Sequence, residues 1–298
     1  MNICTQTDTF EKVFGAEKAI ELLAKAGFES IDWSMFYPVD KGILAASDEE
    51  IKAYFGRLRK VAEDCGIYIY QTHTPFPCYT AEPARDAVIF EAERRALLAS
   101  SVLGAHHAVV HPPILRENRY GCLAAENKEV AMDFYGRLIP YLDEYGISIA
   151  VENMWNSDQV KKTICPTVCS SPYELNDYVD TLNGMCKNGN RFVVCLDVGH
   201  TNLSCRDMNI RDIVNIIGPR LKALHVHDTD GVSDLHTAPG FGNIDWDGFC
   251  AGLKDIGYDG DFVFEADNFY KRFDRELTYD AGAMLYKIGR RLCDKNGL

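Results

Sequence analysis

Apolar runs of four to seven residues alternate with longer amphipathic stretches along the chain. In residues 48–65, apolar side chains recur at intervals of three and four, which is the spacing of one face of an α-helix. Ser47 precedes this stretch and Glu50 follows three positions later, which predicts a capping box at the helix N-terminus. The apolar runs are nearly continuous, a pattern typical of parallel strands that are buried on both faces.

A glycine separates each amphipathic stretch from the next apolar run, as expected where a helix ends in a left-handed residue. With a first strand at 2–5, the pattern gives eight strand–helix units. It predicts an α/β fold with a single (β/α)8 TIM-barrel domain over residues 1–298. A doubly wound open sheet is the alternative, although no G-x-G-x-x-G motif follows the first run. The glycines are Gly27, Gly66, Gly104, Gly146, Gly189, Gly218 and Gly257, and the runs after them occupy 30–33, 67–73, 108–111, 147–152, 192–197, 221–227 and 261–265.

The composition excludes several classes of partner. The 298 residues include 31 Lys and Arg against 44 Asp and Glu, so the net charge is −13, and this acidic excess disfavours nucleic acids and anionic membrane surfaces. No apolar run approaches the roughly 18 residues of a transmembrane helix. The N-terminus lacks a basic segment followed by an apolar stretch, so we expect no secretion signal.

The cysteines point to a reducing compartment. There are 11 of them, without a C-x-x-C pair, and several lie inside apolar runs, as Cys195 does. Free cysteine behaves in such runs as a small hydrophobic residue. We therefore predict reduced, buried thiols in a cytoplasmic protein, with a catalytic thiol as the alternative.

Most apolar runs end in a side chain that can bind a metal or move a proton. In a TIM barrel the C-terminal ends of the strands meet at one face, where active sites lie. Carboxylates and imidazoles are ligands of Zn, Mn and Co, and carboxylates buried together without a cation would repel one another. The pattern therefore predicts a metal centre. Its candidate residues are His73, His111, Glu152, Asp197, His225, His227 and Glu265 at strand ends, His200 in Asp197-Val-Gly-His200, and Asp234 and His236 in Asp234-Leu-His236.

The order of these motifs identifies a family resemblance. They are THTP at 72–75, VHP at 110–112, VEN at 151–153, LDVGH at 196–200, HVHD at 225–228, DLH at 234–236, PGFGNIDW at 239–246 and FE at 264–265. In this order, over nearly the whole chain, they resemble the xylose-isomerase-like barrel superfamily. That superfamily includes endonuclease IV, ketose 3-epimerases, inosose dehydratases and hydroxypyruvate isomerases.

The resemblance implies one to three divalent metal ions per chain, as zinc, manganese or cobalt. Endonuclease IV holds three zinc ions at three sites. The ketose 3-epimerases hold a single Mn or Co, at the site of the second ion named below. The two branches align differently across the seventh strand, so the ligand there is either His225 or His227. By resemblance, the first ion takes His73, His111 and Glu152; the second takes Glu152 as a bridge with Asp197, His225 and Glu265; the third takes His200, Asp234 and His236.

The metal chemistry leaves three functions open. In a sugar isomerase or epimerase, the ion polarises a carbonyl and stabilises an enediolate, while Glu152 and Glu265 act as base and acid, unless they are ligands only. A multinuclear zinc hydrolase or lyase acting on a modified sugar or glycoside is the enzymatic alternative. A sugar-binding or sensor protein is the non-enzymatic alternative.

The charge around the predicted mouth favours a small, unphosphorylated carbohydrate substrate. Residues 61–84, 147–160, 192–205 and 223–253 contain no Lys or Arg, whereas a DNA or sugar-phosphate site needs them. As a separate point, the loop 228–236 departs from the ketose 3-epimerases, which carry an arginine there. The cations near the mouth are Lys41, Arg116, Arg119, Lys271, Arg272 and Arg275.

Candidate substrate contacts are aromatic rings that pack on the C–H faces of a sugar and polar groups that read its hydroxyls. Aromatic loop residues could also pair two chains, so a homo-oligomer is possible. The rings are Trp33, Phe36, Phe76 and Trp155, and the polar groups are Asn153 and His227.

Overall fold

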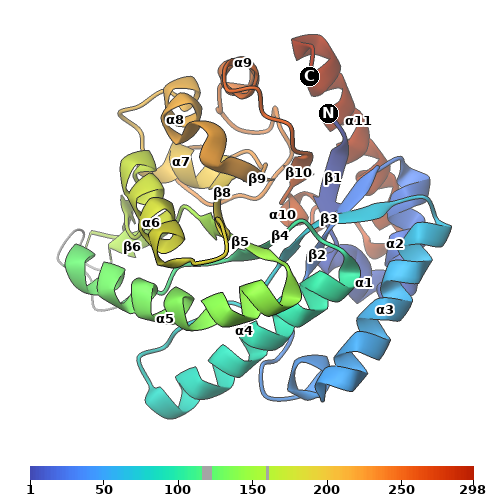
Figure 1. The fold of residues 1–298 in the computed structure, drawn as a ribbon. Coiled ribbons are helices and arrows are strands. Elements are labelled where there is room, and N and C mark those ends of the chain that lie inside the picture. The colour runs from blue at the N-terminus through green and yellow to red at the C-terminus, as the bar shows by residue number, and fades with distance from the viewer. Residues whose placement is uncertain (116–122, 159–160) are drawn as a thin grey trace.

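The computed structural model describes residues 1–115, 123–158 and 161–298 and confirms the TIM barrel (Figure 1). Eight strands pair in parallel in the order β10-β1-β2-β3-β4-β5-β8-β9. These strands are β1 (Ile3–Gln6), β2 (Ser30–Ser34), β3 (Tyr68–His73), β4 (His107–Val110), β5 (Ser148–Glu152), β8 (Phe192–Asp197), β9 (Leu221–His225) and β10 (Phe262–Phe264).

The barrel closes between β9 and β10 through one short bridge rather than a ladder. Val226 pairs with Phe264, Val226 N donates to Val263 O at 2.8 Å, and Glu265 N donates to Val226 O at 3.1 Å. The closure therefore lies at the C-terminal ends of the strands, beside the predicted strand-end residues His225, His227 and Glu265.

Helices surround the sheet as an outer ring (Figure 1). The predicted capping box is present at the start of α3, where Glu50 N donates to Ser47 Oγ at 3.3 Å and Ser47 N donates to the Glu50 carboxylate at 2.9 Å. The helices are α1 (Asp8–Phe14), α2 (Ala16–Ala26), α3 (Asp48–Asp64), α4 (Pro83–Leu103), α5 (Ala124–Tyr145), α6 (Pro172–Met185), α7 (Val198–Ser204), α8 (Ile210–Ile217), α9 (Trp246–Asp255), α10 (Asp267–Tyr270) and α11 (Thr278–Asn296), with short 3-10 turns at Gly42–Ala45, Gly218–Arg220 and Arg275–Leu277.

A glycine directly follows most of the predicted helix ends, but not all of them. Gly104 and Gly146 follow α4 and α5 in the left-handed conformation, at φ of 79° and 68°. Gly189 departs from the pattern, because α6 already ends at Met185. The seventh strand is also shorter than predicted, since β9 ends at His225 and only the single bridge at Val226 continues it.

A two-stranded hairpin lies above the barrel where no regular structure was predicted. β6 (Trp155–Asp158) pairs antiparallel with β7 (Thr163–Pro166). Residues 155–166 are mostly polar and lack alternating apolar positions, so the sequence gives little signal for strands there. The hairpin places Trp155 beside the pocket described below.

The main hydrophobic core contains residues from Ile3 to Cys293 in sequence and fills the layer between the strands and the helices. A second, small apolar cluster consists of Val109, Ala150, Cys195 and Ala223. The ten cysteines of the described part are all free, in agreement with reduced thiols. None of the described helices is long and apolar enough to cross a membrane.

Candidate metal centre

Strand alternation brings the predicted ligands to the inside of the barrel mouth. Side chains two residues apart on a strand point to the same face. Each apolar residue of the second, small cluster therefore shares its face with a polar residue two positions further on. The pairs are Val109 with His111, Ala150 with Glu152, Cys195 with Asp197, and Ala223 with His225.

Glu152 lies at the centre of this constellation. Its Oε2 is 3.3 Å from His111 Nε2, 3.3 Å from His225 Nδ1 and 3.8 Å from His73 Nε2. The side chain is fully buried, and neither carboxylate oxygen has a hydrogen-bond partner among the described residues. A buried anion without donors is unfavourable, so these orphaned oxygens fit a bound cation.

Two of the predicted ligand groups share Glu152. Ligand atoms of His73, His111 and Glu152 lie within 4.8 Å of one another, and so do those of Glu152, Asp197, His225 and Glu265. The second group contains His225 and not His227. Because each group combines imidazole nitrogen with carboxylate oxygen, either donor set suits Zn, Mn or Co.

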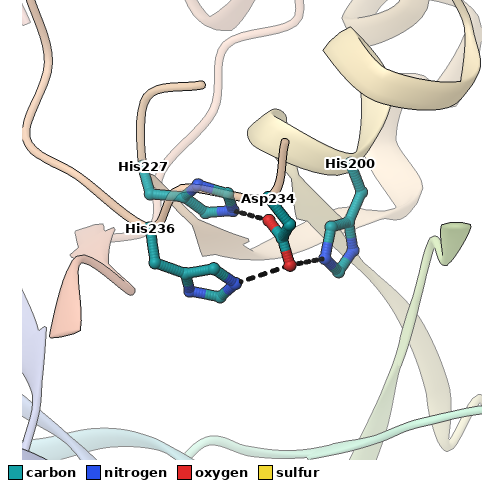
Figure 2. A group of neighbouring side chains, drawn as sticks. All are labelled: His200, His227, Asp234 and His236. Atoms are coloured by element: carbon teal, nitrogen blue, oxygen red, sulfur yellow. Dashed lines mark hydrogen bonds and ion pairs between the residues drawn. The ribbon is translucent and has the colours of Figure 1, made fainter. Parts of the chain in front are cut away.

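The third group surrounds Asp234 (Figure 2). Asp234 Oδ2 is 3.0 Å from His236 Nε2 and 3.8 Å from His200 Nε2. The Nδ1 atoms of these two rings face backbone carbonyl oxygens, at 2.8 Å from Asn153 O for His200 and 3.0 Å from Glu265 O for His236. A proton on Nδ1 would donate to each carbonyl and leave Nε2 free as a ligand, which is the usual arrangement around a metal.

His227 joins this third group as an addition to the three residues predicted. Its Nε2 lies 3.1 Å from both carboxylate oxygens of Asp197 and 3.8 Å from Asp234 Oδ1, and its ring stacks on His236 with centroids 4.1 Å apart. His227 therefore contacts residues of both the second and the third group. The ring has this space because position 199 is glycine, where an added Cβ would lie 2.0 Å from His227 Cε1.

We expect Gly199→Ala to destabilise the protein by about 1–3 kcal/mol, the usual range for overpacking a buried site. The added methyl group displaces His227, so metal uptake should weaken too. Chemical unfolding and metal titration measure the two effects. Gly184→Ala in α6 is the matched control, since its Cβ meets nothing within 4 Å. Equal unfolding midpoints for Gly199→Ala and the wild type would contradict the close fit.

Burial and neighbouring charges separate the histidines into two kinds. Burial lowers the pKa of His73 and of His111 to about 4, so both rings are neutral at pH 7, as a metal ligand has to be. Burial acts in the same direction on His200 and His236, but nearby carboxylates, Asp197 and Glu265 first among them, outweigh it and raise the pKa of each to about 10.

The two candidate catalytic carboxylates also differ. Burial raises the pKa of Glu265 to about 7, because the effect of burial is larger than the opposing effect of His225 and His236, which lower the pKa. Burial acts on Glu152 as well, but His225 and His111 outweigh it and hold the pKa of Glu152 well below its usual value. Two carboxyl groups with separated pKa values are what an acid and a base in one site require.

A pocket of about 620 Å³ opens above the ligands. Three of the predicted sugar contacts line it: Phe36, Phe76, which is 49% exposed, and Trp155. Trp155 Nε1 donates to Asp234 Oδ2 at 3.1 Å. The described lining residues include no Lys or Arg. The cations predicted at 116 and 119 lie outside the described residues.

Three predicted substrate contacts do not line the pocket. Trp33 is fully buried in the hydrophobic core, where its Nε1 donates to Tyr37 OH at 3.2 Å. Asn153 is buried and braces the strand end, with Nδ2 donating to Asp197 O at 2.9 Å and Oδ1 accepting from Asp197 N at 2.7 Å. His227 is buried beneath His236. The structure thus brings none of these side chains to the surface of this pocket.

Sequence reasoning missed two polar residues inside the barrel, Asp32 on β2 and Gln71 on β3. Both are fully buried, and Gln71 Nε2 donates to Asp32 Oδ2 at 2.9 Å. The available signal was a carboxylate within a strand rather than at its end, in Ser30-Ile-Asp-Trp33.

Comparison with known proteins identifies the family. The model of the xylose isomerase-like TIM barrel family matches residues 20–288, so the chain belongs to that family. An uncharacterised protein of Methanocaldococcus jannaschii is 26% identical over 200 residues, which are 66% of this chain and 64% of that protein. The chain thus spans a little under two thirds of that relative's length.

Two solved structures share the fold over nearly the whole chain. A D-tagatose 3-epimerase-like protein is 22% identical, with a TM-score of 0.71 and 99% of each chain covered. The IOLI protein, solved with a bound zinc atom, is 18% identical, with a TM-score of 0.73 and 99% of each chain covered. At these identities the likeness concerns the fold alone.

Proposed function

We propose that this protein is a metal-dependent isomerase or epimerase of a small, unphosphorylated sugar. The observation that carries the proposal is the buried group of Glu152, Asp197, His225 and Glu265 at the barrel mouth, two of whose members, Glu152 and Glu265, line the pocket. The 3-epimerase-like fold neighbour and the zinc in the IOLI protein support this choice.

Glu152, Asp197, His225 and Glu265 would hold the catalytic ion, which is zinc, manganese or cobalt. A divalent ion held there would supply a positive charge that polarises the carbonyl of an open-chain sugar and offsets the negative charge formed when the neighbouring carbon loses its proton. Glu152 is ionised at neutral pH and takes that proton on a carboxylate oxygen. Glu265, whose pKa burial raises to about 7 in the metal-free chain, would donate its own proton to the carbon in place of the one that Glu152 takes.

The pocket surface supports a neutral carbohydrate as the substrate. Binding a phosphate group calls for Arg or Lys, and the described lining residues have neither. Phe76 and Trp155 offer aromatic faces to the C–H side of a sugar ring or chain. Nucleic acid is not a partner in this proposal, because the described residues that line the pocket include none of the cations that phosphodiesters need.

Solvent exchange tests the reaction. The metal-loaded protein is incubated in deuterated water with a panel of unphosphorylated ketoses, and proton NMR follows the hydrogen next to the carbonyl. We expect deuterium to replace that hydrogen with at least one ketose and a chelator to stop the exchange. The same ketoses carrying a terminal phosphate serve as controls and should react more slowly. Cleavage of a glycoside without deuterium uptake would overturn the isomerase.

A hydrolase or lyase with several zinc ions is the second candidate, and the group of His200, Asp234 and His236 favours it, because a one-metal epimerase does not need these ligands. Elemental analysis of protein purified without chelator or nickel separates the two. We expect at least one divalent ion per chain. One ion favours the epimerase, whereas three zinc ions favour the hydrolase or lyase. A chain that contains no metal and takes none up would contradict both.

A further inference from the structure

Asp32 lies on the inner side of His225, opposite the proposed metal ligands. Asp32 Oδ2 is 3.4 Å from His225 Nε2. The other ring nitrogen, His225 Nδ1, is 3.3 Å from Glu152 Oε2 and 3.4 Å from Glu265 Oε2. The imidazole of His225 therefore stands between one inner carboxylate and two outer carboxylates, and all four side chains are buried.

We propose that Asp32 is a positioning residue that keeps the proton of His225 on Nε2, so that the Nδ1 lone pair is presented to a divalent metal ion. A neutral imidazole carries one proton, and a carboxylate beside Nε2 accepts it. Carboxylate–histidine–metal arrangements of this kind fix the ring and strengthen the ligand. The inference rests on the metal site proposed above and not on the isomerase reaction.

The surroundings of Asp32 argue against a purely structural role. The inner faces of β4, β5 and β9 carry Val109, Ala150 and Ala223, which are apolar and fill the same interior. A buried carboxylate is unfavourable there unless it is paired, yet Asp32 Oδ1 has no hydrogen-bond partner among the described residues. A residue kept for packing alone would be apolar.

Gln71 holds Asp32 in this orientation. Its Nε2 donates to Asp32 Oδ2 at 2.9 Å and to Leu224 O at 3.3 Å, so the amide is fixed between β2 and β9. Leu224 immediately precedes His225. The same amide thus connects the strand that carries the inner carboxylate to the strand that carries the ligand.

The test is the affinity of the Asp32→Asn variant for Zn²⁺ and Co²⁺, measured by competition with a chromophoric chelator. Asparagine keeps the size of the side chain, but its amide can donate to His225 Nε2 and so favour the proton on Nδ1. We expect one equivalent of metal to bind about 10–100-fold more weakly. The equivalent at the third ligand group should be unchanged, because that group contains neither of the two histidines beside Asp32, His73 and His225. The cobalt absorption spectrum of the weakened equivalent should change as well.

Asp261→Asn is the matched control. Asp261 is also a buried carboxylate, but it precedes β10 at the opposite end of the barrel, where it accepts from Tyr68 OH at 2.6 Å. This variant should bind metal as the wild type does, even if it unfolds more readily. Gln71→Met is a second test should Asp32→Asn not fold. It removes the donor that orients Asp32, so we expect weaker metal binding than in the wild type.

Three outcomes would overturn the inference. If Asp32→Asn binds metal with wild-type affinity, Asp32 is not required to keep the proton of His225 on Nε2. The proposed metal site would then remain, but the role of Asp32 would not. Complete loss of one equivalent at saturating metal makes Asp32 a ligand, which its place beside His73 and His225 also allows. A wild-type chain that binds neither Zn²⁺ nor Co²⁺ removes the metal site together with the inference. Solvent exchange tests the reaction separately.

Discussion

The Glu265→Gln variant is expected to exchange substrate hydrogen with solvent about 10²–10⁴-fold more slowly than the wild type, the range in which general acid–base groups contribute. Glutamine keeps the shape of the side chain and an oxygen for the metal, but it carries no proton that can be transferred at neutral pH. Glu152→Gln should lose at least as much, because Glu152 also belongs to two ligand groups. NMR in deuterated water measures both variants.

Metal content decides how such a loss is interpreted. A variant that keeps its metal and loses exchange has lost the proton-transferring group, whereas a variant that loses metal has lost a ligand. Glu93→Gln is the matched control. Glu93 is buried outside the ligand groups, and burial raises its pKa to about 8, so it is largely neutral at pH 7 and resembles glutamine. Exchange that survives in both Glu152→Gln and Glu265→Gln would refute their roles as base and acid.

The strand pattern was predictable because burial leaves a direct mark on the sequence. Strands buried on both faces must be apolar, and a helix that follows a strand must turn back over the sheet, so the repeat of run, helix and glycine fixes the topology. The polar ends of the runs were equally visible. His73, Glu152 and Asp197 end their strands in the structure, and two-residue alternation points Glu152 and Asp197 inward with their apolar predecessors.

What depended on the exact register and on packing was not predictable. Trp33 ends an apolar run as Asp197 does, but its ring belongs to the core, since a run does not reveal which face meets the helices. The sequence left the ligand of the seventh strand open between His225 and His227, because the two branches of the family it resembles align differently there. The structure separates them by where each ring ends: His225 faces Glu152 and Glu265, whereas His227 stacks on His236. Asp32 on β2 comes close to His225 on β9 only because the strands close into a barrel.

Metal uptake by the group around Asp234 is expected to strengthen steeply with pH. Carboxylates keep the pKa of His200 and of His236 at about 10 in the metal-free chain, so both are protonated at neutral pH. A metal ion binds the neutral ring, so each ring must release its proton. Below pH 10 each displaced proton makes the apparent affinity about tenfold stronger per pH unit. Two protons therefore predict about 100-fold per unit between pH 6.5 and 8.5.

The group of His73, His111 and Glu152 should behave differently. The pKa of each of its histidines is about 4, so above pH 6 the rings are already neutral and no proton must leave. Its affinity should be flat over the same range. Calorimetry of metal binding in two buffers of different ionisation enthalpy counts the protons released by each equivalent, and His236→Asn should remove the protons that the Asp234 group releases. Affinities that change equally with pH at the two groups would contradict the difference in histidine protonation. Histidines with pKa values of about 4 and about 10 cannot release the same number of protons when metal binds near neutral pH.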